Sequence, residues 1–281
     1  MRLGVFARTF RGSDPETVLA AVAASGYSSA QYNMSCSGLA SMPDSIERRQ
    51  ASRVADASVR TGVAIAAVSG TYNMIHPEPQ VRADGLRRLE VLAARCADLS
   101  TGLITLCTGT RDPVDQWKRH PDNDTAAAWS DLRAAMETAL SIADRHGVDL
   151  GIEPETGNVV SSAGKARRLI DEMKSPRLHV VIDPANLFDV ATIAEQRDLV
   201  TAAIDLLADR IVLAHAKDRR PDGSVTAAGR GILDFDHYFE QLRRIRFTGS
   251  VVAHGLSPEE APGVASYLAA RLEPGSTRAG R

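Results

Sequence analysis

The chain has 281 residues, of which 44% are hydrophobic, so it can bury a large core and has the length of one (β/α)8 barrel. Its 33 basic and 35 acidic residues give a net charge of −2, which provides no basic surface for nucleic acid. No apolar stretch is long enough to span a bilayer, and three cysteines without paired spacing indicate reduced thiols in a cytoplasmic protein.

Strand and helix patterns alternate along the chain, beginning with an apolar run that is too short for a signal peptide. Strands are expected at residues 2–7, 28–33, 63–69, 103–107, 148–153, 178–183, 211–216 and 250–254. Helices are expected at residues 14–25, 44–61, 79–98, 124–146, 162–174, 193–208, 235–246 and 257–271. This alternation predicts an α/β fold, a single-domain (β/α)8 TIM barrel over residues 1–272. An open doubly wound sheet is the rival, but no glycine-rich phosphate loop follows the first strand.

Local signals mark where the helices begin and end. Four glycines follow helical patterns and are expected in the left-handed conformation that ends a helix: Gly26, Gly62, Gly102 and Gly147. Capping segments at 13–16, 122–124 and 257–260 are expected to begin helices. Residues 273–281 show no periodicity and are predicted to be a disordered tail.

Four polar residues stand at the ends of four late strands: Glu153, Asp183, His215 and His254. In a parallel barrel the carboxyl ends of the strands meet at one mouth, where the chemistry of the fold takes place. Two carboxylates and two imidazoles on one rim predict a divalent-metal site. This mixed set of nitrogen and oxygen ligands suits Mn²⁺, Zn²⁺ or Co²⁺ better than Ca²⁺.

Each of these residues also has a structural explanation. Glu153 could pair with a neighbouring strand, and Glu155 could replace it as a ligand because alternate strand residues point the same way. Asp183 could only cap the helical turn that follows it. His215 could be a satisfied core residue, and His254 could orient a loop by hydrogen bonding.

Lys217 and Arg230 are candidates for binding the substrate. Lys217 follows the strand that ends at His215 and could hold an anionic oxygen as a point charge, or form a solvated pair with Asp218. Arg230 lies between two glycines in a loop that allows backbone and guanidinium to approach an anion, although most such arginines are solvated.

The connection over residues 108–123 is longer than the usual loop between a strand and a helix. Loops of this length often form lids or substrate walls, so Arg111, Trp117 and His120 are candidate substrate contacts. Trp117 could shield the site or pack on a neighbouring helix. Cys107, just before this loop, has no adjacent histidine to activate it and is interpreted as buried filler.

From residue 4 to about residue 272 the chain resembles the xylose isomerase-like TIM-barrel superfamily, in particular its sugar phosphate isomerase/epimerase subgroup. The motifs that carry the resemblance are Ile152-Glu153-Pro154, Ile182-Asp183-Pro184-Ala185-Asn186, Ala214-His215-Ala216-Lys217-Asp218, Gly229-Arg230-Gly231-Ile232-Leu233-Asp234-Phe235 and the loop from Cys107 through Trp117 and His120. In the family's epimerases a metal is held by Glu, Asp, His and Glu from the last four strands. Here the first three match, and His254 stands in place of the second glutamate.

The resemblance implies a cytoplasmic, metal-dependent sugar or polyol isomerase or epimerase that transfers a proton next to a carbonyl through a metal-stabilised enediolate. It implies one divalent ion, with Glu153 as the base and His254 returning the proton or completing the ligand set. The expected partner is a small sugar-like molecule, with homo-oligomerisation left open.

Three alternatives follow from the family and its departures. An inosose-type dehydratase would use the same enolate, and a non-catalytic sugar-binding barrel is suggested by the missing second glutamate. The family also includes endonuclease IV, but Cys107-Thr108 and Asn186 stand where its further histidine ligands are expected. The near-neutral charge also disfavours a role in DNA repair.

Overall fold

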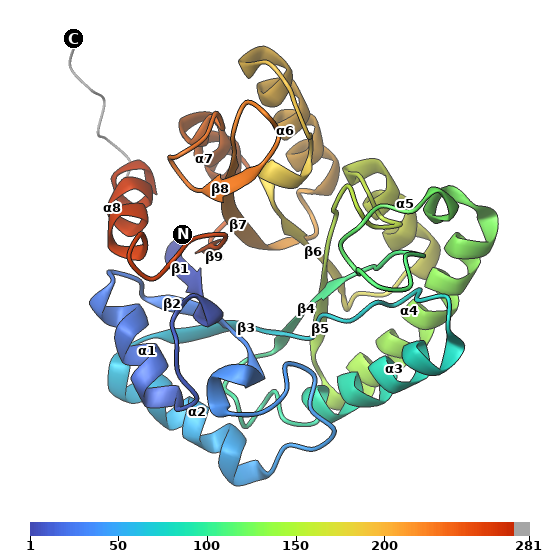
Figure 1. The fold of residues 1–281 in the computed structure, drawn as a ribbon, viewed down its shortest axis with the longest axis horizontal. Coiled ribbons are helices and arrows are strands. Elements are labelled where there is room, and N and C mark those ends of the chain that lie inside the picture. The colour runs from blue at the N-terminus through green and yellow to red at the C-terminus, as the bar shows by residue number, and fades with distance from the viewer. Residues whose placement is uncertain (273–281) are drawn as a thin grey trace.

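The computed structural model describes residues 1–272, which form a closed parallel barrel surrounded by helices (Figure 1). Its strands are β1 (Arg2–Phe6), β2 (Ser29–Tyr32), β3 (Ala64–Ser69), β4 (Leu103–Cys107), β5 (Asp149–Glu153), β6 (Leu178–Ile182), β7 (Ile211–Arg219) and β9 (Ser250–Ala253). Each barrel strand pairs in parallel with the next, and β9 pairs with β1 to close the ring. The predicted (β/α)8 fold is therefore confirmed, while the predicted disordered tail lies outside the described residues.

Eight helices follow the strands and pack around the barrel (Figure 1). They are α1 (Pro15–Ala24), α2 (Arg48–Thr61), α3 (Pro79–Ala93), α4 (Ala126–His146), α5 (Ala163–Met173), α6 (Ile193–Leu207), α7 (Phe235–Arg244) and α8 (Ala261–Leu272). The longest, α4, buries residues at helical spacing that include Leu132, Met136 and Leu140. Within the described residues no helix combines the length and apolar character that crossing a membrane requires.

The predicted helix ends are only partly correct. Gly62 and Gly147 adopt φ values of 70° and 65° directly after α2 and α4, as expected. The prediction for Gly102 was wrong, because α3 ends early at Ala93 and the left-handed residue of the following turn is Ser100, with φ 60°. A single αL residue suffices to redirect the chain into β4, so Gly102 is not needed for that purpose.

The helix starts show a similar shift. Asp14 caps α1 by accepting a hydrogen bond from the Thr17 backbone N–H, as predicted. The start of α4 was wrongly assigned, because residues Pro121–Asp124 form a separate short 3₁₀ helix and Thr125 caps α4. The capping box predicted at 257–260 forms through reciprocal bonds between Ser257 and Glu260, but it closes a turn one residue before α8.

One strand was not predicted. Strand β7 continues past the barrel rim and forms an antiparallel hairpin with β8 (Val225–Ala227). The Asp218 side chain, on this extension, accepts hydrogen bonds from the backbone N–H groups of Arg219, Gly229, Gly231 and Leu233. The glycine loop around Arg230 thus does bind an anion, but that anion is the chain's own buried Asp218.

The barrel interior supports the strand ends that carry the polar residues. Val181, Leu213 and Val252 form a small buried cluster with Ala67, and each lies two positions before Asp183, His215 or His254. Alternate residues of a strand share a face, so packing these apolar side chains inside the barrel points the polar ones into its mouth. Gly151, two residues before Glu153, leaves room in the same layer, since a Cβ there would lie 3.0 Å from Val181 Cγ2.

Candidate metal centre

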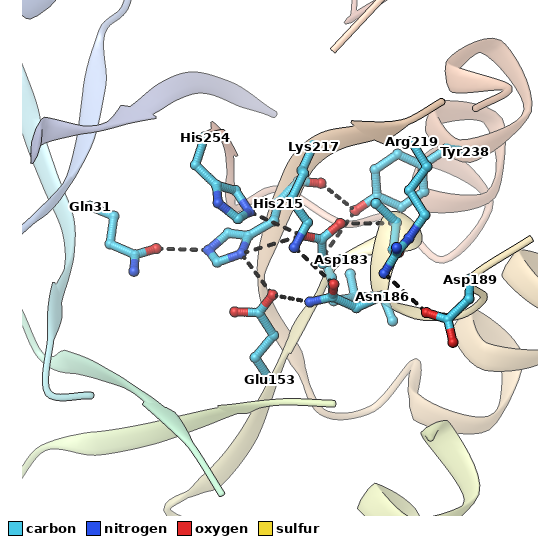
Figure 2. Close-up of polar contacts among 12 residues, drawn as sticks. Gln31, Glu153, Asp183, Asn186, Asp189, His215, Lys217, Arg219, Tyr238 and His254 are labelled. Atoms are coloured by element: carbon cyan, nitrogen blue, oxygen red, sulfur yellow. Dashed lines mark hydrogen bonds and ion pairs between the residues drawn. The ribbon is translucent and has the colours of Figure 1, made fainter. Parts of the chain in front are cut away.

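The four polar residues at the strand ends converge at the mouth of the barrel (Figure 2). Each offers one ligand atom, and these four atoms all lie within 4.8 Å of one another: Glu153, Asp183, His215 and His254. They come from β5, the residue after β6, β7 and the residue after β9. The barrel therefore brings together the residues that the sequence singled out.

Asp183 serves two purposes with its two oxygens. Oδ1 accepts a hydrogen bond of 2.9 Å from the Ala185 N–H and so caps the short turn Pro184–Asn186. Oδ2 lies 3.0 Å from His254 Nε2 and 3.2 Å from Lys217 Nζ. Burial alone would raise the pKa of this carboxyl, but Lys217 and His254 hold it well below its usual value. Asp183 therefore caps this turn and also lies in the cluster, where its role as a metal ligand stays a prediction.

His215 is fixed from behind by a short polar chain. Its Nε2 lies 2.8 Å from Gln31 Oε1, and Gln31 Nε2 donates to Thr105 Oγ1 at 3.0 Å. With Gln31 in this orientation its oxygen accepts from the His215 Nε2–H, so Nδ1 is the nitrogen that faces the cluster. Nδ1 is buried without a hydrogen-bond partner and lies 3.3 Å from Glu153 Oε1.

Lys217 and Asn186 connect the two carboxylates. Lys217 Nζ donates to Asn186 Oδ1 at 2.8 Å, and Asn186 Nδ2 donates to Glu153 Oε1 at 2.7 Å (Figure 2). Burial would lower the pKa of Lys217, but Asp183 and Glu153 raise it above its ordinary value. Lys217 is therefore a buried counter-charge rather than half of a solvated pair with Asp218, although it also lines the cavity.

Charge also sets the protonation of the remaining members. Burial would raise the pKa of Glu153, but the neighbouring His215 imidazole lowers it below its usual value. Burial would likewise lower the pKa of His215, while Glu153 and Asp183 raise it. For His254 burial dominates and lowers the pKa, which favours a neutral imidazole able to act as a ligand.

The arrangement fits a divalent ion of the type that takes mixed nitrogen and oxygen ligands. Ligand atoms bonded to such an ion at about 2.0–2.2 Å lie no more than about 4.4 Å apart, close to the separation found here. The buried, unpartnered Nδ1 of His215 faces Glu153, where an ion would satisfy it. The donor set of two carboxylates and two imidazoles suits Mn²⁺, Zn²⁺ or Co²⁺.

A cavity of about 390 Å³ opens above the cluster. Among its lining residues are Glu155, Lys217 and Trp117. Glu155 is not a member of the cluster, so the alternative that it replaces Glu153 is not supported by the geometry. Its carboxylate makes no hydrogen bond or ion pair with residues 1–272, and burial together with Glu153 raises its pKa to about 7.

Three of the predicted substrate contacts do not reach this cavity. Arg111 donates to Asp131 Oδ2 and to the Ile75 carbonyl, which ties the long loop to α4. His120 Nδ1 accepts a hydrogen bond from the Asp122 N–H and caps a short turn. Arg230 is exposed to solvent on the hairpin loop. Arg111 thus bonds to neighbouring elements, His120 bonds within its own loop, and Arg230 faces solvent. Residue type and position in the sequence do not specify these contacts.

Two contributors were missed at the sequence level. Gln31 orients His215, and Asn186 bridges Lys217 and Glu153. A signal existed for Gln31, since it is a long polar residue inside β2, whose four residues are all buried. Asn186 was noted only as a departure from a family motif, and its bridging role depends on a contact between neighbouring strand ends.

Comparison with known proteins agrees with this fold. The model of the family described as xylose isomerase-like TIM barrel matches residues 19–270. Solved structures with similar folds include 3-keto-D-glucoside 4-epimerase from E. coli (TM-score 0.74, 18% identity, covering 96% of this chain and 99% of that one). D-psicose 3-epimerase from Clostridium cellulolyticum H10, solved with D-tagatose, has a TM-score of 0.75 at 17% identity and covers 97% and 100%.

A "probable 3-DHS dehydratase" from Bacillus anthracis, involved in petrobactin synthesis, also has a TM-score of 0.75, at 11% identity, with 98% of this chain and 100% of that chain covered. A search of curated protein sequences found no match. At these identities the solved structures establish the shared fold, and the reaction must be argued from the site.

Proposed function

Because the chain belongs to the xylose isomerase-like TIM-barrel family, we propose that it is a metal-dependent sugar or polyol isomerase or epimerase. The observation that carries the proposal is the cluster of Glu153, Asp183, His215 and His254, of which all but Asp183 line the adjoining cavity. This activity is supported by the similarity in fold to two sugar epimerases, one named for a 3-keto-D-glucoside and the other for D-psicose.

The cluster residues would hold the ion, and the ion would supply positive charge that stabilises negative charge on the substrate oxygens. Glu153 directs Oε1 to Asn186, which leaves Oε2 to accept a proton from the carbon next to the carbonyl. The electrons of that C–H bond then form the C=C bond of an enediolate. A proton given by His254 or by water to the opposite face of the same carbon gives the epimer. A proton given by Glu153 to the neighbouring carbon, together with transfer of the hydroxyl proton between the two enediolate oxygens, gives the isomer.

Incorporation of solvent deuterium tests this reaction directly. Protein purified without chelator is incubated in D₂O with a panel of ketoses and aldoses, and deuterium next to the carbonyl is measured by NMR. We expect exchange in the wild type and a loss of at least about 100-fold in Glu153→Gln, because general-base catalysis contributes about 10²–10⁴-fold. Glu259→Gln, which changes an exposed glutamate, serves as the control. Sugars that bind without exchange in the wild type would contradict the proposal and favour a non-catalytic barrel.

The same experiment separates the second candidate, an inosose-type dehydratase. The similarity in fold to a dehydratase favours retaining this candidate. A dehydratase would expel a hydroxyl group from the carbon next to the enolate, so its product would lose the mass of one water. Exchange or inversion with unchanged mass supports the isomerase or epimerase.

A Gln31→Leu variant is expected to bind metal about 10–100-fold more weakly, the usual effect of removing a group that orients a metal ligand. Leucine cannot accept the His215 Nε2–H, so the imidazole loses its fixed orientation. Affinity is measured from the concentration of free Mn²⁺ by electron paramagnetic resonance. The control is Gln116→Leu, because Gln116 also lines the cavity but makes no hydrogen bond to a residue of the metal cluster. Equal affinities in the two variants would show that Gln31 has no such role.

A further inference from the structure

A second cavity adjoins the cavity above the metal cluster. Its volume is about 660 Å³, and it lies between the loops that follow β2, β3 and β4. Four residues line both cavities and so form their common border: Ser41, Thr71, Gln116 and Trp117. Hydroxyl, amide and aromatic groups of this kind recognise sugars, since they offer hydrogen bonds to hydroxyl groups and a flat apolar face to a ring.

The two tryptophans of the chain differ in how their side chains are used. Trp129 is buried on α4, where its indole N–H donates to Glu172 at 2.9 Å and Arg168 lies over its ring. Trp117 is 49% exposed, and its indole N–H has no acceptor within residues 1–272. A large aromatic side chain left unpaired at the border of two cavities is available to a ligand.

The loop holds Trp117 in a defined position. Asn123 Oδ1 accepts hydrogen bonds from the Arg111 N–H and the Thr110 hydroxyl, while its Nδ2 donates to the Gly157 carbonyl. A Cβ at Gly157 would lie 2.3 Å from the Trp117 carbonyl oxygen, so the loop after β5 packs directly against the backbone of Trp117. The indole is therefore presented by an ordered framework, which limits the entropy cost of binding.

Tyr72 lines the second cavity, but its hydroxyl group is buried. Its side chain is 8% exposed, and its hydroxyl has no hydrogen-bond partner. The ring lies against Gly85 of α3, where a Cβ would approach within 2.1 Å of ring carbon Cδ2. The hydroxyl itself is buried, so Tyr72 can offer a ligand only the apolar edge of its ring.

The charged side chains around this second cavity are largely paired with one another. Arg88 Nε donates to Asp44, and Lys118 pairs with Asp112 at 3.2 Å. The Asp115 carboxylate accepts a hydrogen bond of 2.9 Å from the Trp117 backbone N–H. This lining favours an uncharged, hydroxyl-rich ligand over a phosphate.

We infer that the substrate is a glycoside, whose reacting sugar lies over the Glu153–Asp183–His215–His254 cluster and whose second sugar unit occupies the neighbouring cavity. The inference rests on the proposed function for the identity of the reacting sugar. It adds that Trp117, at the border of the two cavities, sets the preference for a two-unit substrate. A free monosaccharide fills only the cavity above the cluster.

The test compares D-fructose with the keto-disaccharides lactulose, turanose and isomaltulose, which carry the second sugar at different hydroxyl groups. We expect the wild type to exchange deuterium into at least one disaccharide with a kcat/KM about tenfold above that for fructose. Trp117→Ala should lower the value for the disaccharide about tenfold more than the value for fructose, since a contribution of this size is expected from aromatic packing on the second sugar unit. Trp117→Phe should retain most of the preference.

Binding is read separately, so that the result does not depend on the proposed reaction. Trp129→Phe leaves Trp117 as the single tryptophan of the chain, and its fluorescence reports directly on the border of the two cavities. A disaccharide that changes this emission when fructose does not supports the inference even without exchange in any sugar. The inference is overturned if no disaccharide changes the emission, or if Trp117→Ala lowers the kcat/KM for fructose and disaccharide by the same factor.

Discussion

An Asp183→Asn variant is expected to lose bound divalent metal and to exchange deuterium on the order of 100-fold more slowly than the wild type, or worse. Even groups that only orient a ligand contribute about 10–100-fold to metal affinity, and Asp183 would contact the ion itself. Asparagine has nearly the same shape and its side-chain oxygen still accepts from the Ala185 N–H. The substitution therefore removes the negative charge and keeps the turn that follows β6.

Metal content is measured by elemental analysis of protein purified without chelator, together with the rise in Tm on adding Mn²⁺ or Zn²⁺. Asp189→Asn is the matched control, because this carboxylate lies in the same connection, is 70% exposed and pairs with Arg219 rather than with the cluster. Lys217 keeps Asn186 as a partner in Asp183→Asn, so the variant is expected to fold. Full metal content in Asp183→Asn would disprove the assignment of this residue as a ligand.

The largest loss of stability is expected for Asp218→Ala, by about 3–5 kcal/mol in the free energy of unfolding. Asp218 is 1% exposed, and its carboxylate accepts from four backbone N–H groups on β7 and the loop at residues 229–233. Each buried donor left without an acceptor costs about 1–3 kcal/mol, and water entering the opened loop recovers part of this. Urea denaturation of the metal-free protein measures the change.

Asp222→Ala provides the comparison for that experiment. Asp222 lies in the turn of the same hairpin, is exposed, and accepts only from Ser224. Its replacement is expected to change the free energy of unfolding by less than about 1 kcal/mol. Similar losses in both variants would show that Asp218 does not organise the loop as the hydrogen bonds indicate.

The cluster could be predicted because its members obey a rule that depends only on position. Glu153, Asp183, His215 and His254 end apolar runs spaced by one strand-and-helix unit, and parallel strands in a barrel end at one mouth. Neither the partner atoms nor the support behind the ligands follows from that rule. The contact of Gln31 with His215 joins residues 184 positions apart, and only the closure of the barrel brings β2 close enough.

The wrong or unsupported predictions have a common physical origin. Arg111 and His120 have residue types suited to substrate binding, but in the folded loop Arg111 pairs with α4 and His120 caps a turn. Gly102 follows a helical pattern, yet the helix ends several residues earlier and Ser100 makes the turn. The partners of Arg111 and His120 and the early end of α3 all depend on the folded chain, which a residue type at a given spacing does not specify.

The pairing of the first strand with the last has a consequence for the synthesis of the protein. Leu3 and Gly4 pair with Val251 and Val252, so β1 keeps one unpaired edge on the ribosome until β9 has left the exit tunnel. His254 follows β9 directly, and the complete ligand set therefore exists only when nearly the whole chain has been translated. An ion held by all four residues could therefore bind only after β9 has been synthesised, and until then the edge of β1 that β9 covers stays open to other strands.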